Sequence, residues 1–163
     1  MEGEAQQQPS LSGDEIVLIT DENNVPIGKA ARRDVRKQNL WHRASYIFVY
    51  EKKEGEDTRI LVQKRSMKKD YCPGYYDLAN GGVVGGDETD ELNAQREIEE
   101  EIGMKGLEMK VLDRIKFEDA NNRVWGNIFA VEYDGRELVL QESEVDAVEK
   151  WTVKEALERI KNE

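Results

Sequence analysis

The segment from Thr89 to Ile102 is the feature that most limits how this chain can fold. It contains no glycine and no proline, so it predicts a helix over residues 89–102. Asp87 is placed to cap the start of this helix, and Gly103 is placed to end it. The apolar positions fall four residues apart and form one stripe, which Met104 extends beyond the helix: Ala94, Ile98 and Ile102. The stripe predicts that this helix packs inward against the rest of the chain.

The same stretch holds most of the negative charge of the chain. Eight acids and one base lie between Asp87 and Glu101, a net charge of -7 out of the -11 carried by all 163 residues. Glu97, Glu100 and Glu101 stand at i, i+3 and i+4 on one helix face. Like charges at this spacing repel by roughly 0.2–0.5 kcal/mol per exposed pair. Such a run is ordinarily a solvated helix face, and a hard divalent cation with oxygen ligands is the alternative that offsets the repulsion.

A glycine-rich loop, Gly81-Gly82-Val83-Val84-Gly85-Gly86, comes just before the helix. Glycine lets the backbone approach the carboxylates closely, so a carbonyl of this loop is a candidate for a further metal ligand. Arg96 is within reach of Glu99 or Glu100 and can hold the carboxylates in orientation. Loop and helix together predict a Mg²⁺ site that recruits the phosphates of a substrate.

Composition excludes several classes of function. A net charge of -11 disfavours nucleic-acid polymers and anionic membrane surfaces, because binding to both depends on Lys and Arg. No apolar run approaches the roughly 18 residues of a membrane helix, and residues 1–4 lack the basic start of a secretory signal. With one cysteine, Cys72, and one histidine, His42, the chain has neither an internal disulfide nor a metal site that needs two of either residue. We therefore expect a cytoplasmic protein that acts on small molecules.

The remaining pattern predicts strands before and after the acidic helix. Residues 1–13 lack periodicity and predict a loose tail, followed by a single domain over residues 14–163. Residues 45–51 and 59–65 predict a hairpin, and residues 141–151 are expected to form a loop that ends at a core tryptophan, Trp151. Further strands are predicted at residues 15–20, 25–29, 108–118 and 124–133, and helices at residues 31–38 and 153–161. This order predicts an α/β or α+β fold with a mixed β-sheet between helices.

Loop and helix together contain the pattern G-x5-E-x7-R-E-U-x-E-E-x-G-U, where U is a bulky apolar residue. All nine specified positions are filled, by Gly82, Glu88, Arg96, Glu97, Ile98, Glu100, Glu101, Gly103 and Met104. This pattern resembles the Nudix box. The resemblance implies a Nudix-type α/β/α sandwich and Mg²⁺- or Mn²⁺-dependent hydrolysis of a nucleoside diphosphate linked to another moiety. It also implies that Glu97, Glu100 and Glu101 are the catalytic metal ligands, helped by the Gly82 carbonyl, with Arg96 and Glu88 orienting them.

Outside the box, the segments DENN, HRASYIFVY, ILVQKRS and PGYYD are similar to the branch of this family that contains isopentenyl-diphosphate isomerase. The isomerase pattern places a catalytic cysteine and a metal-binding histidine just before the box, where this chain has Leu78-Ala79-Asn80. Similarity without these residues predicts a hydrolase in an isomerase-like scaffold. An isomerase and a non-catalytic binding module are the alternatives, and the retained carboxylates count against the second.

Residues outside the box are candidates for proton transfer and for substrate contact. Glu144 is the first candidate for the general base, and Glu101 is the other. Arg43 is a candidate substrate contact, His42 is expected to be structural, and Trp125 either stacks a base or packs within a strand. Four cations before the glycine loop predict phosphate contacts, with an exposed turn that balances the acidic helix as the alternative: Lys64, Arg65, Lys68 and Lys69. Members of the family are often dimers, so the resemblance implies a homodimer.

Overall fold

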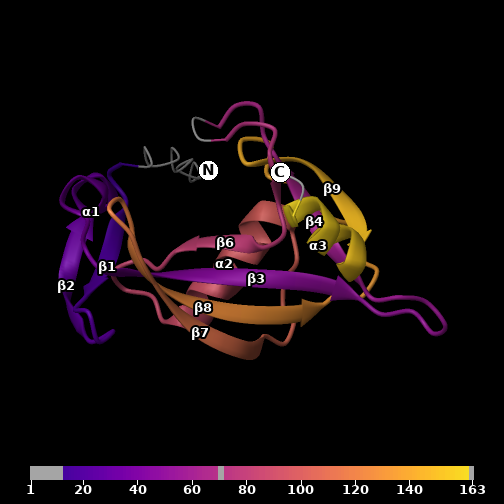
Figure 1. The fold of residues 1–163 in the computed structure, drawn as a ribbon, viewed down its shortest axis with the longest axis horizontal. Helices are drawn as coiled ribbons and strands as arrows, with labels where there is room; N and C mark the ends of the chain where they lie inside the picture. The colour runs from indigo at the N-terminus through magenta and orange to yellow at the C-terminus, as the bar shows by residue number, and fades with distance from the viewer. Residues whose placement is uncertain (1–12, 70–71, 162–163) are drawn as a thin grey trace, which may run out of the picture.

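The computed structural model describes residues 13–69 and 72–161, so the predicted tail lies outside the described residues except for residue 13. Figure 1 shows the helices and strands of this part of the chain. In chain order they are β1 (Ile16–Thr20), β2 (Pro26–Ala31), α1 (Arg32–Gln38), β3 (His42–Glu51), β4 (Arg59–Arg65), β5 (Tyr76–Asp77), β6 (Asn80–Val83), α2 (Asp90–Ile102), β7 (Lys110–Glu118), β8 (Arg123–Glu132), β9 (Val145–Thr152) and α3 (Val153–Lys161). Of the helices in these ranges, none is long and apolar enough to cross a membrane.

Strand β3 is the centre of the sheet because other strands pair along both of its edges. Nearly its whole length pairs in parallel with β8, and β7 extends the sheet beyond β8. On the other edge, residues 44–47 pair antiparallel with β6. Strands β1 and β2 join the beginning of β3 through the pair Ile19↔His42. Parallel and antiparallel pairs occur together, so the predicted mixed sheet is confirmed.

Strands β3 and β4 form the predicted hairpin only beside its turn. They share the pairs Tyr50↔Ile60 and Glu51↔Arg59, after which β4 diverges from β3. Strand β4 pairs along its length with β9 and, further on, with β5. The expected loop over residues 141–151 is therefore wrong, because residues 145–152 form β9. This segment alternates poorly between apolar and charged residues, and its pairing with β4 makes it a strand.

Two helices cover opposite faces of the sheet. Helix α2 packs its apolar stripe against a core that contains Leu61 of β4, which confirms the predicted inward face. The next residue of β4, Val62, packs instead with Trp151 and Ala156, and Ala156 belongs to α3. Because successive strand residues point to opposite faces, α2 and α3 lie on opposite sides of β4. The layered α+β architecture and the core position of Trp151 are both as predicted.

The two ends of α2 are set by local hydrogen bonds. At the start, the Thr89 side-chain oxygen accepts a hydrogen bond from the Leu92 N–H at 3.2 Å, so Thr89 and not Asp87 is the cap. Asp87 lies too early in the chain to serve the first turn, and its carboxylate pairs with Lys29. At the other end, Gly103 has a φ of 75°, which confirms the predicted stop.

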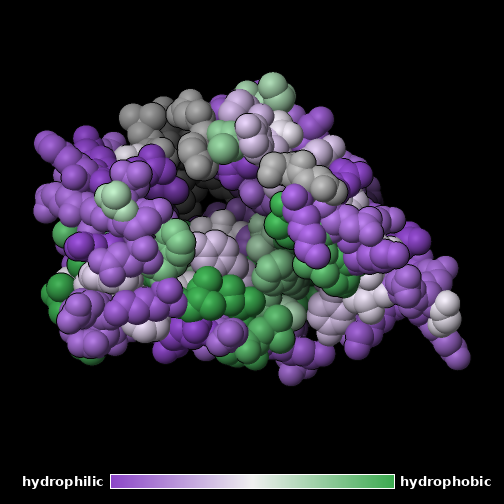
Figure 2. Space-filling view, in the orientation of Figure 1, coloured by the Kyte–Doolittle hydropathy of each residue, from purple (hydrophilic) through white to green (hydrophobic). Residues whose placement is uncertain are grey.

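Strand β7 is exposed at every residue. Figure 2 shows mostly hydrophilic residues on the face in view, with a green apolar patch low on that face, over the β7–β8 part of the sheet. The exposed apolar residues of β7 are Val111, Leu112, Ile115 and Phe117.

Candidate functional site

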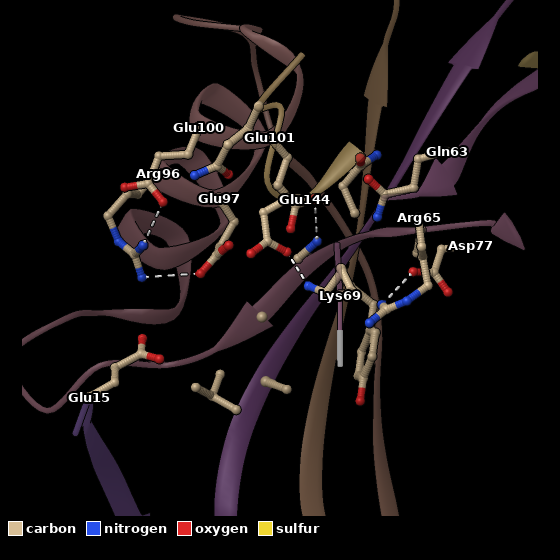
Figure 3. A pocket seen from close by; sticks show the side chains of 18 of the residues that line it. Glu15, Gln63, Arg65, Lys69, Asp77, Arg96, Glu97, Glu100, Glu101 and Glu144 are labelled. Carbon is tan, nitrogen blue, oxygen red and sulfur yellow. Dashed lines mark hydrogen bonds and ion pairs between the residues drawn. The ribbon is translucent and has the colours of Figure 1, made fainter. Parts of the chain in front are cut away.

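One cavity is lined by helix α2, by strands β3, β4 and β6, and by Glu15 near the start of the described chain. Its volume is about 1710 Å³. Figure 3 shows the acidic side chains of α2 on one side of this cavity and Gln63, Arg65 and Asp77 on the other. Small-molecule sites usually measure roughly 300–1,000 Å³, so this cavity has room for a ligand with two distinct parts.

The three carboxylates predicted as metal ligands all line the cavity, but they differ in burial. Glu101 is 7% exposed, and the side chain of Glu97 is 14% exposed. The Glu100 side chain is 48% exposed. The helix therefore directs two carboxylates inward and leaves the third in contact with solvent.

The glycine loop brings backbone against these carboxylates. The Gly81 N–H donates to Glu101 Oε2 at 3.3 Å. A Cβ at Gly82 would lie 2.8 Å from Glu97 Oε1, and one at Gly81 would lie 1.9 Å from the Ser45 carbonyl oxygen. Gly81 therefore needs glycine to pair β6 with β3, while Gly82 lets the Glu97 carboxylate lie against the backbone.

Burial strongly changes the acidity of the two inner carboxyls. It raises the pKa of Glu101 to about 8, and the neighbouring charge of Glu97 adds to this effect. Burial also raises the pKa of Glu97 to about 7, although the positive charge of Arg96 opposes the change. Two carboxyls that resist ionisation side by side indicate a place where added positive charge would be stabilising.

Arg96 connects the carboxylates of the loop and helix. Its Nε and Nη2 donate to the two oxygens of Glu88 at 2.7 and 2.9 Å, while Nη1 donates to Glu100 Oε2 at 3.0 Å. A third ion pair joins Nη2 to Glu97 Oε1 at 3.2 Å. The predicted alternative partner, Glu99, is paired instead with Lys105. Although burial opposes it, hydrogen bonding by Arg96 holds the pKa of Glu88 below its ordinary value.

The donor atoms fit a hard divalent cation, because they are all carboxylate or carbonyl oxygens. The Glu97 carboxylate lies close against the backbone of Gly82, where a side chain would come between them. A carboxylate and a backbone carbonyl can share one cation only when they lie this close together. Glu97 and Glu100 are turned toward Arg96. Within the described part of the chain, no three acidic, histidine or cysteine side chains are arranged to hold one ion. To bind a cation, Glu97 and Glu100 would therefore have to break their ion pairs with Arg96 and turn toward the metal.

Glu144, the predicted general base, lines the same cavity. Its carboxylate forms an ion pair with Lys69, and its charge contributes to the raised pKa of Glu101. Figure 3 shows this ion pair between the carboxylates of α2 and the far wall. Both candidate bases are thus in the same cavity, with a lysine between them and Arg65.

The structure separates the predicted substrate contacts into two groups. Arg65, Lys68 and Lys69 line the cavity. Lys64, Arg43 and Trp125 are not among its described lining residues. Lys64 lies between Gln63 and Arg65 on β4, so it points to the opposite face.

The other two residues are occupied elsewhere in the structure. Arg43 donates from Nε to Asn24 Oδ1 at 2.6 Å and is 3.7 Å from Asp90. The ring of Trp125 packs 6.5 Å from that of Trp41. Both side chains therefore have structural contacts, which was the alternative for Trp125.

Several lining residues were not predicted from the sequence. They include Glu15, Arg32, Tyr46, Gln63 and Asp77, while His42, expected to be structural, is 8% exposed and also lines the cavity. The sequence holds one hint that Gln63 faces a site: it is a polar residue directly after the apolar run of residues 60–62. The others come from segments far apart in the sequence, which only the fold brings together.

Comparisons with known sequences agree with the motif. A family model described as "NUDIX domain" matches residues 40–163. The Escherichia coli (strain K12) protein named "Uncharacterized Nudix hydrolase YfcD" is 42% identical over 142 residues, which cover 87% of this chain and 76% of that protein. "Uncharacterized Nudix hydrolase PA4841" of Pseudomonas aeruginosa is 33% identical over 136 residues, which cover 83% of this chain and 78% of that protein.

Solved structures share the fold. The crystal structure of DR0079 from Deinococcus radiodurans matches with a TM-score of 0.76 and 21% identity, covering 91% of this chain and 90% of that one. The NUDIX domain of Shewanella oneidensis NrtR, crystallised in complex with ADP ribose, matches with a TM-score of 0.60 and 15% identity. That match covers 72% of this chain and 77% of the other. These matches show the same arrangement of mixed sheet and helices.

Proposed function

Because the chain belongs to the NUDIX domain family, we propose that it is a metal-dependent pyrophosphohydrolase. Its relatives are named Nudix hydrolases, and it keeps every specified position of the box, so it is an enzyme that acts on a phosphoanhydride. The proposed substrate is a nucleoside diphosphate linked to another moiety, or a related small organic diphosphate. Water attacks one phosphorus, and a nucleotide or a phosphorylated fragment leaves.

The observation that carries the proposal is the cluster of Glu97, Glu100 and Glu101 beside Gly82 at one side of the cavity. These carboxylates and the Gly82 carbonyl are the groups that would hold Mg²⁺ or Mn²⁺. When bound, the metal neutralises charge on the diphosphate and lowers the pKa of a bound water. Metal binding also supplies the positive charge that the raised pKa values of Glu97 and Glu101 indicate is favourable there.

Other residues of the chain orient the reacting groups. Glu88 fixes Arg96 through two hydrogen bonds and so keeps the guanidinium beside Glu97 and Glu100 when these carboxylates turn to the metal. Glu144 is the proposed general base, with Glu101 as the other candidate. The Glu144 carboxylate forms an ion pair with Lys69. A substrate phosphate that draws Lys69 away would leave that carboxylate free to accept the proton.

The isomerase alternative is not favoured. Leu78 and Ala79 occupy the part of the cavity where the isomerase pattern has its catalytic cysteine and metal-binding histidine. Cys72 is not among the described residues that line the cavity. The isomerase-like scaffold remains a prediction from sequence segments, and so do a single domain over residues 14–163, a homodimer and a cytoplasmic location.

The test is an activity panel with and without Mg²⁺. It contains nucleotide sugars, dinucleotides, NADH, nucleoside triphosphates and isopentenyl diphosphate. We expect Mg²⁺-dependent release of phosphorylated products from at least one phosphoanhydride, and no isomerisation of isopentenyl diphosphate. Isomerisation without hydrolysis would establish the alternative instead.

The Glu100→Gln variant tests the role of the carboxylates. Glu100 is half exposed, so the substitution should leave the fold intact while removing one charged ligand. We expect at least a hundredfold loss of Mg²⁺-dependent turnover with an unchanged circular dichroism spectrum. Glu99→Gln, on the same helix but paired only with Lys105, is the matched control. Unchanged turnover of Glu100→Gln at saturating Mg²⁺ would overturn the assignment.

A further inference from the structure

We propose that Gln63 determines specificity by binding the part of the substrate that is attached to the diphosphate. We further propose that this part is a neutral group that donates hydrogen bonds from N–H or O–H. The inference rests on the proposed function, because it assigns the second part of the same cavity. Gln63 belongs to β4, whereas the candidate metal ligands belong to α2 and the glycine loop.

The first observation is an unpartnered acceptor inside the cavity. Gln63 is 7% exposed, and its Oε1 has no hydrogen-bond partner among the described residues. Figure 3 shows its side chain reaching from β4 into the cavity. A buried carbonyl oxygen without a donor is destabilising, whereas an apolar residue of the same size would not be. Leu61, two residues earlier on the same face of β4, packs in the apolar core, whereas Gln63 lines the cavity.

The second observation is the group beside Gln63. Asp77 stands directly opposite Gln63 in the antiparallel pairing of β4 and β5, so the two side chains are neighbours on one face. Arg65, two residues further along β4, donates from Nη1 to Asp77 Oδ2 at 3.0 Å. This bond holds the carboxylate in place and neutralises its charge. Gln63, Asp77 and Arg65 form the wall of the cavity that faces α2. This wall therefore presents acceptor oxygens, of the Gln63 amide and the Asp77 carboxylate, without net charge.

This chemistry selects among the groups that a diphosphate can carry. A second phosphate needs cations that are not already neutralised, and each basic residue of the described lining is in an ion pair with an acid: Arg32, Arg65, Lys68, Lys69 and Arg96. A hydrocarbon chain would leave Gln63 Oε1 without a donor. A nucleobase with amino or ring N–H groups, or a sugar with hydroxyls, supplies the missing donor. These two sources share the chemistry that the wall recognises.

The experiment measures binding, so it does not depend on turnover. The probes are AMP, ribose 5-phosphate, inorganic pyrophosphate and isopentenyl diphosphate, each titrated in the presence of Mg²⁺ by calorimetry. The variant is Gln63→Met, which keeps the length of the side chain and removes the amide. The matched control is Lys64→Met, the next residue of β4, which faces away from the cavity.

We expect Gln63→Met to raise the Kd of at least one donor-bearing probe about tenfold or more. Pyrophosphate and isopentenyl diphosphate should bind unchanged, and Lys64→Met should resemble the wild type throughout. A loss confined to AMP assigns the donor to the base, and an equal loss for ribose 5-phosphate assigns it to the sugar. Both of these results support the inference.

Three results would overturn the inference. In the first, the wild type binds neither AMP nor ribose 5-phosphate. In the second, Gln63→Met binds both as the wild type does, and in the third it loses affinity for all four probes equally. A wild type that binds the probes but hydrolyses no phosphoanhydride refutes the proposed function alone, since the Gln63 result is still read from binding.

Discussion

Arg96 acts as the counter-ion of α2 at the scale of single residues. It contacts Glu88, Glu97 and Glu100 at N···O distances between 2.7 and 3.2 Å. Of the three, only Glu88 has further donors among the described residues, the Gly85 N–H at 2.9 Å and Asn93 Nδ2 at 3.4 Å, so Glu88 keeps its position when the other two carboxylates turn. At the proposed metal site, we therefore expect a metal to compete with Arg96 for Glu97 and Glu100, while the bond to Glu88 keeps the guanidinium close by.

The buried histidine gives a prediction about pH. Burial lowers the pKa of His42 from its ordinary 6.5, so the folded chain takes up its proton at a lower pH than the unfolded chain. Below about pH 6.5 the unfolded state binds more protons, and the free energy of unfolding falls as the pH falls. We expect His42→Gln to lose less stability than the wild type as the pH falls. Thermal unfolding of both proteins at pH 7.5 and 5.5, with saturating Mg²⁺ in both buffers, measures this loss. An equal loss of stability in variant and wild type would contradict the prediction.

At the scale of elements, the two longest helices begin and end where local chemistry sets them. Thr89 accepts a hydrogen bond from the first turn of α2, and Gly103 adopts the left-handed conformation that ends it. At α3, the Glu155 N–H donates to Thr152 Oγ1 while the Thr152 N–H donates to the Glu155 side chain, a reciprocal cap. Both caps lie within a few residues of the helix that they start.

The cap of α2 gives a prediction about stability. We expect Thr89→Ala to lower the free energy of unfolding by about 1 kcal/mol, because the first turn loses a hydrogen-bond acceptor. Asp87→Ala is the control, since Asp87 is largely exposed and pairs only with a surface lysine, and its cost should be at most a few tenths of a kcal/mol. Urea unfolding of both variants measures the difference. An equal loss in both would show that Asp87 also stabilises the helix.

Local signals explain which elements could be predicted. Helices α2 and α3 follow from apolar periodicity, and both were expected within one residue of their observed bounds. Strand β9 could not be predicted in this way, because only Val145 and Trp151 are buried and the residues between them do not alternate. Its partner, β4, lies 80 or more residues earlier in the chain, and the pairing decides the structure.

At the scale of the whole molecule, the net charge of -11 is concentrated where one cavity wall needs a counter-charge. The box and its carboxylates could be placed from spacing alone. Gln63 and Asp77 on the facing side could not, because they reach the cavity only after β4 diverges from β3. Lys64 and Trp125 were chosen by residue type, and the alternation of their strands turns them away.

The acidic wall predicts stabilisation by divalent metal. A ligand that binds only the folded chain raises the free energy of unfolding by about 2.7 kcal/mol at 100 times its Kd. We expect Mg²⁺ to raise the Tm, EDTA to reverse the change, and KCl at equal ionic strength to have a much smaller effect. Glu97→Gln combined with Glu101→Gln should abolish the Mg²⁺-induced shift. A shift of equal size in this double variant would place the metal elsewhere.

The early divergence of β4 from β3 also bears on how such a protein changes over generations. The carboxylates proposed to hold the metal lie on α2, while Gln63 and Asp77 lie on β4 and β5. Mutations on the two walls are therefore largely independent in their effects. With these proposed roles, a gene duplicate would acquire a new substrate through a few changes in β4 and β5, while selection keeps the carboxylates of α2.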